Sequence, residues 1–164
     1  MKTRASLIAL VLPLLLPGCR QADGPMPEPS GEVPNRLADI TRDLQAVARG
    51  DEQARQDLAD DVTVFVDSDG EARMAINELS RRTAEVVTGS RLSEQSAQRL
   101  SQQLWTAAAA RELSQRQVET LQGEMHALLV EIGVPEDRAE NVATQVGEVQ
   151  RRLTDRPKRW YQLF

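Results

Sequence analysis

Few side chains in this 164-residue chain could do chemistry. His126 is its only histidine and Cys19 its only cysteine, so a metal at His126 would need carboxylates alone to complete its coordination. We therefore interpret His126 as a flanking or surface residue of a helix. No serine stands in the Gly-x-Ser-x-Gly setting of a hydrolase nucleophile, and none has a base suggested by the spacing. A hydrolase acting on cell wall or lipid would need a catalytic pair that the chain does not display.

The acidic run from Asp67 to Gly70 is a second candidate for ligand chemistry. A calcium loop that began at Asp67 would need glycine at its sixth position, which is Ala72 here. The run is therefore predicted to be a solvated turn. No glycine loop of the kind that binds phosphate occurs in the chain. We predict no catalytic residue, no metal, no cofactor and no small-molecule substrate, and hence a protein that is not an enzyme.

Cys19 closes a segment typical of an export signal. Lys2 and Arg4 form a basic head, residues 5–16 an apolar run, and Gly18 precedes the cysteine. The run is broken by Pro13 and is too short to remain as a membrane-spanning helix. Residues 1–18 are therefore predicted to be a signal peptide. The alternative is an ordinary secretory signal with Cys19 near the cut, which would leave an odd thiol exposed.

The stretch from Leu16 to Cys19 resembles the lipobox of bacterial lipoproteins, with Pro17 as a departure from the pattern. The resemblance implies that Cys19 becomes the acylated first residue, carrying palmitate-type chains that tether the protein to a membrane. Three acyl chains hold firmly where a single chain holds weakly. Arg20 occupies the place of the aspartate that, in this family, retains a protein at the inner membrane. The resemblance therefore implies the periplasmic face of the outer membrane.

Composition limits the partners and the source of stability. The formal net charge is −5, and it becomes −7 without residues 1–18, since Lys plus Arg falls from 20 to 18 against 25 Asp plus Glu. Such a balance does not favour nucleic acid. With no second cysteine, stability must come from helix packing. Residues 19–35 are predicted to be a lipidated cysteine followed by a flexible, proline-rich linker.

From residue 36 the apolar residues recur at helical spacing, which predicts an all-α domain over residues 36–155. We expect a small bundle of about five to six helices. Gly50, Gly89 and the turn at residues 133–135 are predicted helix ends, and Ser93 and Ser114 are predicted N-caps. Residues 62–66 are rich in β-branched and aromatic residues, so a short strand is the alternative there. The predicted buried faces are Leu37, Ile40, Leu44 and Val47; Leu58, Val62, Phe65 and Val66; Ala72, Ile76, Leu79, Thr83 and Val86; Ala97, Leu100, Leu104 and Ala107 or Ala108; Val118, Leu121, Met125, Leu128 and Ile132; and Ala139, Val142, Val146, Val149 and Leu153.

Two further features concern arrangement and charge. The last two helices carry regular three-four apolar spacing around a short turn, which predicts a C-terminal antiparallel helical hairpin. The first two predicted helices carry an acidic face, which is interpreted as solvated: Asp51, Glu52, Asp57, Asp60 and Asp61.

Residues 156–164 form a basic aromatic tail that follows Arg151 and Arg152. One hypothesis is that its aromatic rings fold back to plug one end of the bundle, leaving the cations solvated at a helix C-terminus. The other is that the tail contacts a protein partner or anionic lipid head groups. The candidate contact residues are Arg156, Lys158, Arg159, Trp160, Tyr161 and Phe164.

Together these features predict a non-enzymatic, lipid-anchored periplasmic protein, a helical adaptor or assembly factor that docks on an envelope protein. Pilotins, small lipoproteins that escort secretins, offer a functional analogy without a motif match. The alternative is a stress chaperone, because Leu113 to Gln117 is similar to the Leu-Thr-x-x-Gln element of the Spy and CpxP family, with serine for threonine. Helix capping by Ser114 explains the same residues.

Overall fold

The computed structural model describes residues 32–64, 70–110 and 113–154. The described residues form six α-helices and no strand, which confirms the predicted all-α bundle. The helices are α1 (Glu32–Ala48), α2 (Glu52–Thr63), α3 (Gly70–Val87), α4 (Glu94–Ala109), α5 (Gln115–Glu131) and α6 (Glu136–Thr154). The predicted signal peptide and basic aromatic tail lie outside the described residues, as does the predicted linker up to residue 31.

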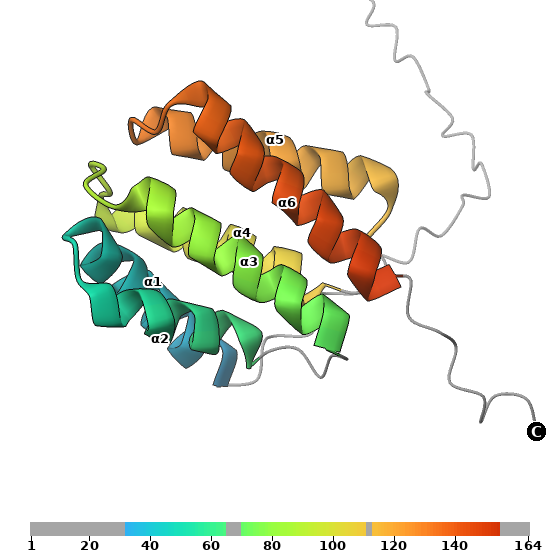
Figure 1. The fold of residues 1–164 in the computed structure, drawn as a ribbon, viewed down its shortest axis with the longest axis horizontal. Helices are drawn as coiled ribbons and strands as arrows, with labels where there is room; N and C mark the ends of the chain where they lie inside the picture. Colours follow the sequence, from blue (N-terminus) through green and yellow to red (C-terminus); the bar gives the residue numbers. More distant parts are fainter. Residues whose placement is uncertain (1–31, 65–69, 111–112, 155–164) are drawn as a thin grey trace, which may run out of the picture.

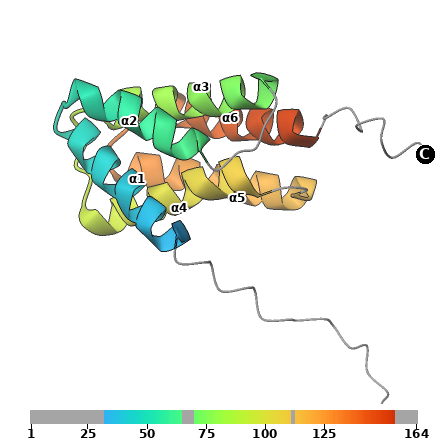
Figure 2. The same cartoon turned by 90° about the horizontal axis from the view of Figure 1, so that it is seen from below.

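The six helices form two layers of three. Helices α2, α3 and α6 make one layer, and α1, α4 and α5 make the other (Figures 1 and 2). Helix α1 packs on both α2 and α4, while α6 packs on both α3 and α5. The close packing of α5 against α6 around a short turn is the predicted C-terminal antiparallel hairpin.

The core is built from the predicted apolar stripes. Leucine, isoleucine, valine, alanine and Met125 fill it, and burial of each large aliphatic side chain contributes about 1.5–3 kcal/mol. Leu37, Val118 and Leu153 are only half-buried, and in α3 it is Val87, one residue beyond the predicted Val86, that is fully buried. Both Ala107 and Ala108 are buried. The largest fully buried side chains are Ile40, Leu44, Leu58, Ile76, Leu79, Leu100, Leu104, Met125, Leu128 and Leu129.

Three glycines make tight turns at one end of the bundle, which we call the glycine end. Gly50, Gly89 and Gly133 have φ values of +91°, +76° and +92°, a region that favours glycine because it has no Cβ. Each follows the helix whose end was predicted there. The Gly89 N–H donates to the Ala48 carbonyl at 3.0 Å, so two of the turns are joined by a backbone hydrogen bond. Helix α1 begins, and α6 ends, away from this end (Figure 1).

Three helix N-termini are closed by short polar side chains. Ser93 accepts from the Ser96 N–H at 3.1 Å. Ser114 and Gln117 form a reciprocal capping box. These two caps separate α3, α4 and α5, as predicted. Asp51 closes α2 in the same way by accepting from the Gln53 N–H at 3.0 Å.

The start of α1 differs from the sequence expectation, while the predicted second helix is confirmed as far as residue 63. Helix α1 begins at Glu32, inside the range assigned to the linker. Pro34 is compatible with this because the N–H groups of a first turn have no partner within the helix. In the region of the alternative strand, Val62 and Thr63 belong to α2. Val62 follows Ala54 and Leu58 at helical spacing and is fully buried with them, which explains why helix prevails over β-propensity there.

Candidate functional site

The sites predicted from sequence fall largely outside the described residues. This applies to Cys19 and to the tail contacts Arg156, Lys158, Arg159, Trp160, Tyr161 and Phe164. Among the described helices, none is long and apolar enough to span a membrane.

The two cations just before the tail are occupied in ion pairs. Arg151 contacts Glu148 at 2.7 Å, and Arg152 contacts Glu148 at 2.8 Å and also Glu71 of α3. Hydrogen bonds from Arg152 and Arg151 lower the pKa of Glu148 below its ordinary value. Arg152 therefore ties the end of α6 to the start of α3. It is less free to recruit a partner than its place in a basic run suggested.

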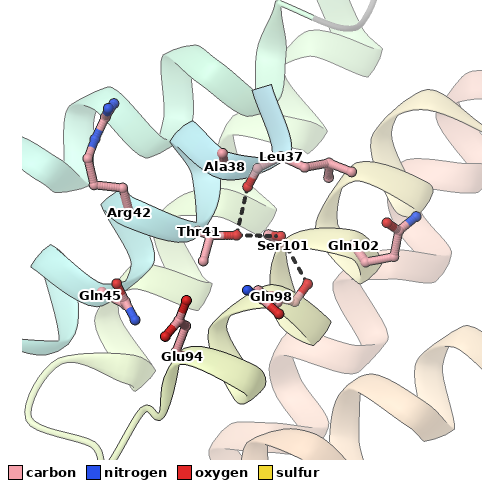
Figure 3. A pocket seen from close by; sticks show the side chains of 9 residues that line it. All are labelled: Leu37, Ala38, Thr41, Arg42, Gln45, Glu94, Gln98, Ser101 and Gln102. Carbon is pink, nitrogen blue, oxygen red and sulfur yellow. Dashed lines mark hydrogen bonds between the residues drawn. The ribbon is translucent and has the colours of Figure 1, made fainter. Parts of the chain in front are cut away.

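A groove lies between α1 and α4 on the described surface (Figure 3). Its volume is about 470 Å³, within the range of ligand sites in proteins, but it is open and polar. Residues from one face of each helix line it: Leu37, Ala38, Thr41, Arg42, Gln45, Glu94, Gln98, Ser101 and Gln102.

Two hydroxyl groups meet at the floor of this groove. The Thr41 Oγ1 lies 2.9 Å from the Ser101 Oγ and 2.7 Å from the Leu37 carbonyl (Figure 3). Ser101, which is buried, donates to the Gln98 carbonyl at 3.0 Å. A nucleophilic serine needs an adjacent base, and the described lining of the groove offers Ser101 no histidine or lysine. The two hydroxyls are therefore a contact between α1 and α4.

The rim of the groove consists of amide side chains with one charge of each sign. Gln98 and Gln102 of α4 are exposed, and Gln45 of α1 is half-buried. An amide side chain both donates and accepts hydrogen bonds, which matches the alternating groups of a peptide backbone. The rim of the groove can therefore both donate and accept hydrogen bonds.

A second hollow lies between α3 and α6 and is balanced in charge. Arg82 donates through Nε to Glu78 at 2.6 Å and through Nη1 to the Asn141 side chain of α6. Arg81 contacts Glu78 at 2.8 Å and also Glu85. Hydrogen bonds from Arg81 and Arg82 lower the pKa of Glu78 to about 2. The hydrogen bond from Arg82 to Asn141 joins α3 to α6, while the ion pairs lie within α3.

Asp43 is a polar residue that the sequence analysis missed. It is 5% exposed, and its Oδ2 meets no hydrogen-bond donor among the described residues. Burial, followed by the charge of Asp61, raises its pKa to about 6. A sequence signal existed, because Asp43 lies three residues after Ile40 and four before Val47, on the apolar stripe of α1. The neighbouring Asp61, assigned to a solvated face, is in fact half-buried.

Two further candidates from the sequence analysis are His126 and the acidic turn at residues 67–70. His126 is half-buried on α5, and the described residues contain no group of three or more histidine, cysteine or acidic residues placed to hold a metal. Of the predicted turn at residues 67–70, only Gly70 is described, as the first residue of α3.

The large apolar side chains exposed on the described surface are Val64, Met74 and Val130.

The structure thus defines a small two-layer six-helix bundle with a polar groove along α1 and α4. Comparison of the chain with known protein families, with curated proteins and with solved structures finds no match.

Proposed function

We propose that this protein is a non-enzymatic adaptor of the bacterial envelope, anchored through acylated Cys19 at the periplasmic face of the outer membrane. Its bundle docks on an envelope protein. The observation that carries this proposal is the α1–α4 groove, which is open, polar and lined by amide groups. Its described lining supplies hydrogen bonds to a polypeptide and no activated nucleophile.

The groove is also well placed for an adaptor. Helix α1, which forms one wall, is the first helix after the predicted tether, so a partner segment in the groove lies next to the anchored end of the bundle. The basic aromatic tail, including Arg159 and Trp160, is proposed as a second contact with the same partner or with anionic head groups. An extended segment of the envelope protein is the proposed occupant of the groove.

Site-specific photo-crosslinking in cells tests this proposal. A photoreactive side chain replaces Gln102 on the groove rim, and in a matched variant it replaces Gln56, an exposed glutamine on α2 in the other layer. We expect one dominant envelope protein attached at position 102 and not at 56. The adduct should disappear when Gln98→Trp, one helical turn earlier, fills the groove while circular dichroism shows an intact bundle.

Other outcomes separate the alternatives. A diffuse set of clients at both positions would favour the chaperone hypothesis. A dominant adduct at position 102 that survives Gln98→Trp but is lost on truncation after Arg156 would place the docking site in the tail. Absence of any adduct at position 102 would overturn docking through the groove.

A further inference from the structure

The carboxyl group of Asp43 lies in surroundings that do not suit an ionised acid. Its side chain is 7% exposed, and its Oδ2 is buried without a donor among the described residues. The nearest cation is Arg42, whose Nε lies 3.6 Å from the Asp43 Oδ1 and whose Nη1 is held by Asp39 at 3.0 Å. The ion pair with the exposed Arg42 leaves the second, buried carboxylate oxygen without a partner, which is destabilising.

The groups that face Asp43 from α2 are also acids. Asp61 and Asp57 both act on it, and its side chain is within hydrogen-bonding reach of Asp61. Asp61 in turn is acted on by Asp39, Arg36 and Arg42 of α1. Helices α3 and α4, which also pack on α1, contribute none of the leading charges on either group. A carboxylate cannot donate a hydrogen bond to another carboxylate, but a protonated one can.

We propose that Asp43 and Asp61 share one proton across the interface of α1 and α2, and that this proton makes the contact a pH-sensitive clamp. With the proton present, Asp43 donates to Asp61 and its buried oxygen is satisfied. When the proton leaves, two carboxylates face each other in a partly desolvated interface. Their repulsion weakens the packing of α2 against α1. This inference stands independently of what binds in the groove.

The direction of the pH dependence follows from the folded and unfolded states. Burial and then Asp61 raise the pKa of Asp43 from 3.8 to about 6, while burial and then Asp39 raise the pKa of Asp61. The folded protein therefore binds more protons than the unfolded chain between about pH 4 and 6. The stabilisation is fully present below the unfolded pKa and is lost as the pH rises through the folded pKa. From Asp43 alone, the unfolding constant should rise about tenfold between pH 5 and pH 8.

The test is equilibrium unfolding of the whole chain from pH 5 to pH 8, combined with carboxyl-carbon NMR titration. In the unaltered protein, we expect Asp43 to titrate near the raised value and the unfolding constant to rise with pH. Asp43→Asn should remove that rise, because an amide donates to Asp61 at every pH. Asp61→Asn should reduce the rise and lower the pKa of Asp43 toward its ordinary value, because the second carboxylate is gone and the new amide donates to Asp43, while the burial of Asp43 remains. Asp60→Asn is the matched control, since Asp60 is exposed and paired with Gln56.

Asp43→Asn and Asp60→Asn variants with the same pH dependence would overturn the clamp. So would an Asp43 resonance that titrates at the ordinary value in the unaltered protein. A rise in stability when Mg²⁺ is added at pH 8 would also overturn it, because a cation and not a proton would then satisfy the pair. If Asp43→Asn does not fold, the titration of Asp43 in Asp61→Asn decides the question alone.

Discussion

Gly133 and Gly123 have opposite effects on the stability of the fold, because only one of them occupies a backbone conformation that favours glycine. Gly133 lies in the left-handed region at φ +92° with no atom within 4 Å of a Cβ placed there, so the demand for glycine comes from the backbone alone. Gly123 lies within α5 in ordinary helical geometry and also has open space around it. At this position glycine increases the conformational entropy of the unfolded chain, although the helical backbone does not require a glycine.

These two positions give a matched prediction at the residue scale. Gly133→Ala should lower the free energy of unfolding by about 1–2 kcal/mol, because it forces a Cβ into the left-handed region. Gly123→Ala should raise it by about 0.5–1 kcal/mol. Chemical denaturation of both variants measures the two changes. A Gly133→Ala protein as stable as the unaltered chain would show that the turn between α5 and α6 can change its backbone geometry.

At the scale of elements, the helices are bounded by local side chains. The Ser114 Oγ accepts from the Gln117 N–H at 3.4 Å, while the Gln117 Oε1 accepts from the Ser114 N–H at 2.9 Å. Leu113 packs against the core just before this cap. The cap accounts for the arrangement of serine, glutamine and leucine that resembles the Spy and CpxP element.

Removal of the cap should weaken the start of α5. Ser114→Ala is expected to lower the free energy of unfolding by about 1 kcal/mol, because the Gln117 N–H loses its side-chain acceptor. Ser114→Asp, which preserves the acceptor, should stay close to the unaltered protein. Hydrogen exchange of the first amides of α5 distinguishes local fraying from global unfolding. Equal stability of the two variants would contradict the role of the cap.

For the whole molecule, attachment to the membrane is proposed to depend on lipid at one residue. Cys19→Ser should abolish acyl labelling and release the protein from the membrane fraction, while the bundle remains folded. The physical reason is that each buried methylene of an acyl chain contributes about 0.8 kcal/mol to membrane binding. Fractionation and labelling measure both effects.

A second variant separates lipid attachment from sorting. Arg20→Asp should keep the acyl label and, in an enteric host, move the protein to the inner membrane. Unchanged labelling of Cys19→Ser would contradict the lipobox resemblance. Retained outer-membrane location of Arg20→Asp would contradict only the sorting rule.

Most of the bundle could be predicted from short stretches of sequence. Apolar spacing in α6 places Ala139, Val142 and Val146 on one buried stripe, as expected. The start of α1 could not be predicted as well, because the proline-rich composition before residue 36 obscured a helix that begins at Glu32. The candidate groove was not predicted at all. Its rim glutamines lie on the polar side of each helix, where the sequence pattern is the same as that of any solvated face.

The sequence by itself determined the all-α class, the glycine turns and the serine caps, because helical periodicity and capping depend on residues within a few positions of one another. Only the tertiary structure decided which helices meet. Thr41 reaches Ser101 across 60 positions, and Gln150 of α6 completes the end of α4 by donating to the Ala107 carbonyl at 2.7 Å. It also decided that Asp43 faces Asp61. The rotation and register of packed helices set these pairings, and both depend on the fit of side chains across the whole core.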